Sequence, residues 1–356
     1  MVLEKARLKH VRNFEEEVLE FKPGVNLILG NNAQGKTNLL ESIYFACIGK
    51  LFRSSRLKDL LQFGKSDYHL ELHFLKDHKR EIFLYAGDRH QHKMTVNRLD
   101  IERRSDLFGR FPMILFAPDH LQMIKEGPSQ RRGFLDREIS LLSKRYFHHV
   151  VQYNKTLSQR AALLKNKGDE RLLDVYDAQL VSYGLPILEM RRSFLEDLEV
   201  GAKDAHQHIA PSEVLQLSYE STLSEETPYL DQLRDSRERD LHYGNTSVGI
   251  HLDDIKVDIN GLDVRRYGSQ GQVRLAALSM FLGLIPISEA RLEEKPIILL
   301  DDVFSELDRS RRENIISRLQ GYQAIMTTTD LDNIDAKEIS NKLFIQGGKL
   351  RGVEHE

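Results

Sequence analysis

Two short, largely apolar runs stand out along the chain, one near its start and one near its end. Residues 25–29 (VNLIL) follow the turn pair Pro23-Gly24, and residues 297–300 (IILL) follow Pro296. Runs of this length bounded by turn residues are typical of strands buried on both faces. A helix is predicted soon after the first run, where the apolar positions at helical spacing are Leu39, Leu40, Ile43 and Tyr44. The first run therefore begins a strand–loop–helix unit.

Alternating apolar and polar positions predict further strands in the first third of the chain. These segments are residues 2–11, 68–74, 82–85 and 94–96. Asn97-Arg98 is predicted to form a turn. We interpret these strands as a mixed sheet beside a parallel one. Residues 114–119 (ILFAPD) predict a strand whose following loop couples to the middle of the chain, with Gln122 or Asp119 as its key residue.

The middle of the chain has helical periodicity. Residues 129–165 predict one long amphipathic helix, and apolar positions from Leu173 to Leu198 predict a second, kinked at Pro186. Helices of about 30 residues reach only about 45 Å. Alternation over 246–259 and the pair Asn260-Gly261 predict a hairpin. The expected division is one lobe of residues 1–128 and 285–356, with residues 129–284 inserted as a mainly helical lobe.

The segment between the first strand and its helix ends in lysine and threonine. It reads Gly30-Asn31-Asn32-Ala33-Gln34-Gly35-Lys36-Thr37 and fits the pattern G-x-x-x-x-G-K-[ST]. Backbone N–H groups of such a loop point at phosphate oxygens at the start of a helix. Lys36 supplies a cation for the β- and γ-phosphates, and the Thr37 hydroxyl can ligate Mg²⁺. The loop therefore predicts a site for ATP with Mg²⁺.

Two carboxylates follow the second apolar run directly. Asp301 and Asp302 would lie at the carboxyl end of a buried parallel strand, where α/β sheets bind ligands. Asp301 is the candidate Mg²⁺-linked carboxylate. Asp302 is the candidate group that orients or deprotonates the attacking water, which makes Asp302 and Lys36 the predicted catalytic pair.

Three weaker sequence signals accompany the phosphate loop and the two carboxylates. Ser269-Gln270-Gly271-Gln272 precedes a helical stretch and predicts an anion site at a helix start, although a capped helix explains it equally well. Residues 305–308 (SELD) follow the second carboxylate, and a strand at 324–326 leads into Thr327-Thr328-Thr329. Their order resembles the layout of ABC-type ATPases: phosphate loop, signature, carboxylate strand, D-loop and switch strand. In that class the signature of one subunit closes over the nucleotide of another.

The chain resembles the RecF family, bacterial recombination and repair ATPases, over nearly its whole length. The matching segments are residues 8–14 (LKHVRNF), 30–38 (GNNAQGKTN), 131–136 (RRGFLD), 269–272 (SQGQ) and 299–308 (LLDDVFSELD). His251 and Asp253-Asp254 match the family's G-P-H-R-D-D stretch, but Ile250 and Leu252 replace its proline and arginine. The resemblance implies an α/β ABC-type P-loop ATPase head with mixed and parallel sheets plus an inserted helical lobe. It also implies nucleotide contacts from Arg12, Asn38 and Thr329.

The resemblance further implies what the protein does. It predicts a weak DNA-dependent ATPase that forms an ATP-dependent homodimer on double-stranded or junction DNA. The expected partners are RecR, RecO and the RecA pathway, in recombinational repair and the SOS response. Hydrolysis is expected to be slow and to reset the dimer.

Composition limits the location and the DNA contacts. No signal peptide and no apolar stretch near the roughly 20 residues of a membrane span were found, so we expect a cytoplasmic, nucleoid-associated protein without membrane contacts. Cys47 is the only cysteine, which excludes a disulfide framework. The net charge is −3, so DNA binding requires a local basic patch. The candidates are Arg53, Arg56 and Lys58, then Arg131 and Arg132, and also Lys50, Arg103, Arg104, Lys155, Arg160, Lys165 and Lys167.

Two other classes compete with this interpretation. An ATPase subunit of a membrane transporter would place its signature about a hundred residues after the phosphate loop, whereas Ser269 follows Lys36 by 269 − 36 = 233 positions. An SMC-like repair ATPase with coiled-coil arms would need hundreds of helical residues. The helical insertion here is too short for such arms.

Overall fold

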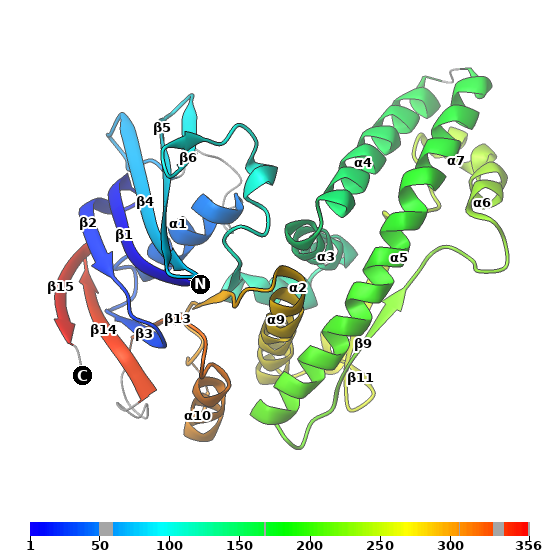
Figure 1. The fold of residues 1–356 in the computed structure, drawn as a ribbon. Coiled ribbons are helices and arrows are strands. Elements are labelled where there is room, and N and C mark those ends of the chain that lie inside the picture. Colours follow the sequence, from blue (N-terminus) through cyan, green and yellow to red (C-terminus); the bar gives the residue numbers. More distant parts are fainter. Residues whose placement is uncertain (50–59, 167–168, 306, 330–337, 355–356) are drawn as a thin grey trace.

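The computed structural model describes residues 1–49, 60–166, 169–305, 307–329 and 338–354. Two sheets and the helix between them form a body, and a group of helices stands beside it (Figure 1). We call α4 (Lys144–Lys165), the first half of α5 (Glu170–Ile209), α6 (Tyr229–Asp235) and α7 (Arg237–Tyr243) the arm, because they project away from the body.

The first sheet of the body is antiparallel throughout. Its strands, in spatial order, are β2 (Phe14–Glu20), β1 (Val2–Val11), β4 (Asp67–Lys76), β5 (Lys79–Asp88), β6 (His92–Val96) and β7 (Leu99–Asp100). Asn97 and Arg98 both have positive φ, 51° and 69°, as the predicted turn requires. The N-terminal strands were therefore predicted, but they do not form a mixed sheet.

The second sheet holds the phosphate loop and is parallel except at one edge. Its spatial order is β15 (Lys349–Glu354), β14 (Ile339–Gln346), β3 (Val25–Leu29), β13 (Ala324–Thr328), β12 (Ile297–Leu300) and β8 (Met113–Phe116). Only β15 runs antiparallel to its neighbour, which makes this sheet mixed. The predicted α/β class with parallel and mixed sheets is confirmed.

Both faces of the second sheet are buried, which explains the continuous apolar runs. Ile297 and Leu299 of β12 pack with α1 (Lys36–Ile48) and the first sheet. Ile298 and Leu300 pack on the opposite face against the helices of the middle of the chain. Successive side chains of a strand point to opposite faces, so this one strand joins two hydrophobic cores.

The rest of the chain contains helices and a small sheet. The helices are η2 (Arg104–Leu107), η3 (Pro118–Leu121), α2 (Gln122–Lys125), α3 (Pro128–Leu142), α4 (Lys144–Lys165), α5 (Glu170–Ile209), α6 (Tyr229–Asp235), α7 (Arg237–Tyr243), α8 (Val264–Tyr267), α9 (Gln270–Leu292) and α10 (Arg309–Arg318). The small antiparallel sheet has the order β11 (Leu262–Asp263), β10 (Asp254–Ile259) and β9 (Leu215–Glu220).

The first predicted long helix is two helices. Ser143 separates α3 from α4 with extended backbone angles, φ −145° and ψ 105°, and its side chain accepts a hydrogen bond from the amide of Tyr146 over 3.2 Å. A serine that caps a helix in this way begins it. The prediction of one continuous helix over 129–165 was therefore wrong.

The second predicted helix is longer than expected. α5 has 40 residues and runs through Pro186, so it spans about 60 Å at 1.5 Å per residue. The predicted hairpin is confirmed, because β10 and β11 pair antiparallel across Asn260-Gly261, but its first strand begins at Asp254 and not at residue 246. Asp253, just before it, is buried and accepts hydrogen bonds from the backbone amide and hydroxyl of Thr222, and Gly249 has φ 135°. These contacts hold a compact loop instead of a strand.

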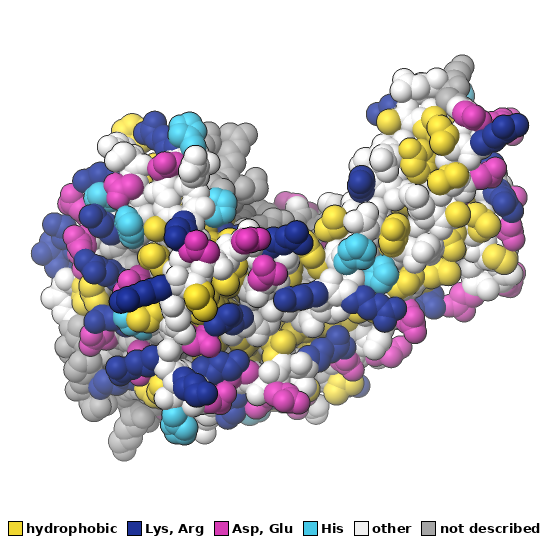
Figure 2. Space-filling view, turned by 45° about the horizontal axis from the view of Figure 1, so that its top comes forward, with side chains coloured by type: hydrophobic (Ala, Val, Ile, Leu, Met, Phe, Trp, Pro, Cys, Tyr) yellow, Lys and Arg dark blue, Asp and Glu magenta, His cyan; other side chains and the backbone are white. Residues whose placement is uncertain are grey.

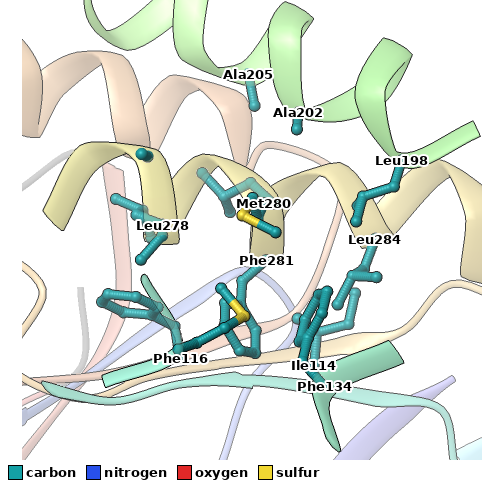
Figure 3. Packing of buried hydrophobic residues seen from close by; sticks show 14 of the residues in the cluster. Ile114, Phe116, Phe134, Leu198, Ala202, Ala205, Leu278, Met280, Phe281 and Leu284 are labelled. Atoms are coloured by element: carbon teal, nitrogen blue, oxygen red, sulfur yellow. The ribbon is translucent and has the colours of Figure 1, made fainter. Parts of the chain in front are cut away.

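Helix α9 is the central element of the second core. Figure 3 shows it between α5 and the sheet, with Phe281 facing Phe116 and Phe134. α9 is long and apolar enough to cross a membrane, and 83% of its most apolar window is buried inside the protein. The expectation that no apolar stretch reaches this length was wrong, because a fully enclosed core helix has the same composition.

The backbones of α5 and α9 touch at one crossing point. A Cβ atom on Gly201 of α5 would lie 2.6 Å from the carbonyl oxygen of Gly283 of α9, and one on Gly283 would lie 2.5 Å from the amide nitrogen of Ala202. Only glycine allows so close an approach. The two helices are therefore packed directly against each other. The division into two lobes remains a proposal, and its boundary at 284/285 falls inside α9.

Candidate nucleotide site

The phosphate loop lies at the carboxyl edge of the second sheet. β3 ends at Leu29, residues 30–35 form the loop, and α1 begins at Lys36. β13 is the direct parallel neighbour of β3, and β12 is the neighbour of β13. The ends of all three strands therefore meet at one edge.

Asn13 supports the phosphate loop from the first sheet. Its Nδ2 donates to the carbonyl oxygen of Gln34 over 3.1 Å, and its Oδ1 accepts from Asn38 Nδ2 over 2.9 Å. Gly35 has φ 109°, and a Cβ atom there would lie 2.3 Å from Asn13 Nδ2. Position 35 therefore requires glycine. Asn13 was not predicted individually, although it lies within the RecF-like segment 8–14.

Lys36 points its ammonium group into the loop. Its Nζ donates to the carbonyl oxygens of Gly30 and, over 2.9 Å, of Asn31. Burial lowers the pKa of Lys36, while the negative charges of Asp302 and Asp301 act in the opposite direction. The amine thus lies inside the loop and close enough to Asp302 and Asp301 to feel their charges, a place suited to a polyphosphate.

The two predicted halves of the site are in direct contact. Asp301 is 3% exposed, and its two carboxylate oxygens accept hydrogen bonds from Thr37 Oγ1 over 2.7 Å and Thr327 Oγ1 over 2.6 Å. Thr37 and Asp301 are 264 positions apart in sequence. The fold therefore brings the beginning and the end of the chain together.

Thr37 and Asp301 fit a magnesium ion. Hydroxyl and carboxylate oxygens are hard ligands, and Mg²⁺ commonly takes one or two protein oxygens plus phosphate and water. Within the described residues no group of three or more His, Cys, Asp or Glu side chains could hold a metal ion. The donor set thus suits an ion shared with a bound phosphate.

A cleft of about 540 Å³ opens beside these residues. It is lined by Asn32, Ala33, Gln34, Gly35, Lys36, Thr37, Asn38, Pro118, Asp301, Asp302 and Thr327. Most of the predicted phosphate-binding residues and both aspartates therefore share one cavity. Thr327 was predicted only as part of the switch strand, and the structure adds it to the lining.

Asp302 has an unusual backbone conformation. Its φ is 48°, which non-glycine residues seldom adopt. Its amide donates to Thr327 Oγ1 over 2.9 Å, and its carbonyl oxygen accepts from Arg274 Nη2. Hydrogen bonds thus hold both the amide and the carbonyl group of Asp302, and the residue lines the cleft.

Other predicted contacts lie around the cleft. Arg12 donates to Glu41 of α1 over 3.3 Å, and Thr329 is exposed directly after β13. Asp119 lies in η3 and Gln122 begins α2, so both follow Pro118 at the cleft wall and the choice between them stays open.

His120 lies between Asp119 and Gln122. Its ring stacks on Phe281 at a centroid distance of 4.3 Å, and burial holds the pKa of His120 well below its usual value.

The signature segment does not line this cleft. Ser269 caps α9: its hydroxyl accepts from the amide of Gln272 over 3.2 Å, while the Gln272 side chain accepts from the amide of Ser269 over 3.0 Å. Ser269, Gln270 and Gly271 are exposed, and no residue of the segment lines the cleft. The capped-helix interpretation is thus correct, and it leaves the helix start open to another molecule.

Several predicted basic contacts are internal. Arg131 is 3% exposed; it forms two hydrogen bonds with the Asp254 carboxylate and donates to backbone carbonyls of residues 123–126. Arg132 donates to the carbonyl of Asp253 over 2.6 Å. Arg160 is fully buried between Asp177 and Asp240. We therefore correct the assignment of Arg131 and Arg160 to a DNA surface, since buried arginines paired inside the protein do not reach phosphates.

Arg53, Arg56 and Lys58 lie outside the described residues, as does Glu306 of the predicted D-loop.

Comparison with known proteins identifies the family. The model of the RecF/RecN/SMC N-terminal domain matches residues 2–345. The DNA replication and repair protein RecF of Clostridium acetobutylicum is 38% identical, over 98% of this chain and 99% of that protein. The chain belongs to the RecF family. RecF of Clostridioides difficile is 35% identical, over 100% of this chain and 99% of that protein.

Solved structures agree with this assignment. The structure described as the recombination mediator protein RecF–ATP in the RecFOR pathway superposes with a TM-score of 0.88 at 35% identity, over 98% of each chain. An Smc head bound to the C-terminal winged-helix domain of ScpA gives a TM-score of 0.60 at 15% identity, which shows the shared fold alone. The RecF fold, ABC-type and α/β, is therefore confirmed for this chain.

Proposed function

We propose that this RecF-family chain is an ATPase that dimerises on DNA when it binds ATP. The observation that carries the proposal is the hydrogen bond between Thr37 and Asp301, which assembles one cleft from the two ends of the chain. The exposed start of α9 supports dimerisation, because it is available to the nucleotide of another copy.

The residues of the cleft divide the chemistry between them. The loop from Gly30 to Thr37 binds the phosphates through backbone N–H groups, and Lys36 neutralises their charge. Thr37 and Asp301 would hold Mg²⁺, and the ion would supply positive charge beside the phosphates. Asp302 orients the attacking water and accepts its proton. ATP binding closes the dimer, and slow, DNA-stimulated hydrolysis reopens it.

DNA and the other partners follow from the family. The relatives are described as DNA replication and repair proteins, and the solved RecF structures are described as part of the RecFOR pathway. We therefore propose duplex and junction DNA, RecR, RecO and the RecA pathway as partners of this chain. The corresponding location is the cytoplasm at the nucleoid, and the corresponding process is recombinational repair with the SOS response.

One experiment tests the proposal as a whole. Fluorescence anisotropy with labelled duplex, single-stranded and junction DNA is measured with and without ATP, together with light scattering for dimerisation. Wild type should bind duplex or junction DNA more tightly with ATP. Lys36→Met should lose this ATP effect and the ATP-dependent dimer, because the phosphates lose their cation. Equal dimerisation of Lys36→Met, or DNA binding indifferent to ATP, would contradict the proposal.

Helix α4 is the DNA-contacting surface that we propose among the described residues. None of its 22 residues is Asp or Glu, although the chain has 54 of them. Lys144, Arg145, Lys155 and Lys165 are exposed along it. Its length of about 33 Å is close to one turn of duplex DNA, about 34 Å. In Figure 2 the arm stands apart from the body, so that the molecular surface is hollowed between them.

Charge reversal on α4 tests this surface. Lys144→Glu with Lys155→Glu should weaken duplex binding at least tenfold and lower the slope of log K against log salt by about 2, because two phosphate contacts are lost. The control is Lys79→Glu with Lys203→Glu, which changes the net charge equally at exposed positions outside α4. Equal weakening by both pairs would show a nonspecific charge effect and contradict the proposed surface.

A further inference from the structure

Arg274 connects the helix that begins at Ser269 to the backbone of Asp302. It lies on α9, five residues after Ser269, and is 8% exposed. Its Nη2 donates to the carbonyl oxygen of Asp302 and, over 2.7 Å, to the hydroxyl of Ser305. One guanidinium group thus reaches the residue that lines the cleft and the segment that follows it.

The backbone conformation of Asp302 is one that neighbouring groups must hold, and Arg274 is one of these groups. Its φ of 48° lies in the left-handed region, where residues with a Cβ persist only when their surroundings hold them. Thr327 Oγ1 holds the amide side and Arg274 holds the carbonyl side. The direction in which the Asp302 carboxylate points is therefore set partly by a residue of α9.

The start of the same helix is exposed and does not line this chain's own cleft. In the proposed dimer, Ser269 contacts the nucleotide of the other copy. α9 is a single helix from Gln270 to Leu292, so a shift of its first turns on dimer closure moves Arg274 as well. Closure over one nucleotide is thereby transmitted to the carboxylate at the other.

We propose that Arg274 is a positioning residue that makes hydrolysis at one nucleotide depend on signature contact with the other. The inference rests on the proposed function. One nitrogen of Arg274, Nη2, donates to both acceptors, and the planar guanidinium holds that nitrogen in a fixed place, whereas lysine carries its ammonium on a flexible chain. Arg274 is not assigned a contact with the nucleotide.

The expected signature of this role is a loss of turnover without a loss of binding. Arg274→Gln should lower kcat about 10- to 100-fold, because a displaced catalytic group costs up to about 100-fold. KM and ATP-dependent dimerisation should stay within about threefold of wild type, since no nucleotide contact is removed. Arg274→Lys should recover part of kcat. The measurements are steady-state ATP hydrolysis, binding of a fluorescent ATP analogue and light scattering.

The matched control is Arg291→Gln, the same change on the same helix, where the side chain pairs with Asp197 over 2.8 Å. It should leave kcat unchanged. If Arg274→Gln does not fold, Ser305→Ala decides, because it removes one acceptor without leaving a buried charge; kcat should fall about threefold or more. An unchanged kcat in the folded variants, or an equal loss in Arg291→Gln, would overturn the inference. A wild type that neither dimerises with ATP nor hydrolyses it would instead overturn the proposed function.

Discussion

Substitution of Ser269 is expected to abolish ATP-dependent dimerisation while each subunit still binds ATP. Ser269→Arg places a bulky side chain at the exposed start of α9, and Ser269→Asp places a negative charge against the phosphates of the partner's nucleotide. Light scattering should detect no dimer for either variant. The affinity for a fluorescent ATP analogue should stay within about threefold, because the segment contributes nothing to this chain's own cleft.

The pair of variants separates closure from helix stability. Arginine removes the cap of α9 and should cost about 1 kcal/mol in the free energy of unfolding, whereas aspartate is itself a good cap and should cost little. Loss of the dimer in both variants therefore cannot be a consequence of the lost cap. Loss of ATP binding by the isolated subunit would show that the signature acts within its own chain and would refute the trans arrangement.

The second large effect is expected at Asp302. Asp302→Asn keeps the size of the side chain and both backbone contacts, but it removes the base that accepts a proton from water. Hydrolysis should fall about 100- to 10,000-fold, the range attributed to general base catalysis. The ATP-bound dimer should form normally and persist much longer than that of wild type, since hydrolysis is the step that reopens it.

Asp169→Asn is the matched control for this variant. Asp169 is exposed and caps α5 by accepting from the amide of Arg171 over 2.9 Å, a role that asparagine performs equally well. Its hydrolysis rate should match wild type. Retained hydrolysis in Asp302→Asn would transfer the role of base to another group in the cleft.

The nucleotide cleft could be predicted because its residues follow buried strands directly. Gly30 follows β3 and Asp301 follows β12, and parallel strands bring their carboxyl ends to one edge whatever the chain does between them. The pairing of Asn13 with Gln34 and of Arg274 with Asp302 could not be predicted. These contacts join segments that no local pattern relates.

The middle of the chain was predicted less well, for two physical reasons. Apolar spacing continues from Leu142 to Tyr146 across the break at Ser143, so periodicity alone does not detect it, although a serine before a helix is a capping signal. Arginine patterns were also misleading. An arginine such as Arg131 is expected to be exposed when only its sequence neighbours are considered. Its partner Asp254 lies 123 positions away, so the sequence pattern does not show the pairing.

The contact of Gly201 with Gly283 has a mechanical consequence. Sliding of one helix along the other would bring a residue with a side chain to the crossing point, where only glycine fits. We therefore expect α9 and α5 to turn together as one rigid unit. From the crossing point to Glu170, α5 extends about 46 Å, so a rotation of about 5° at α9 moves the tip of the arm by about 4 Å. If closure of the proposed dimer turns α9, a spectroscopic label at that tip should report the closure.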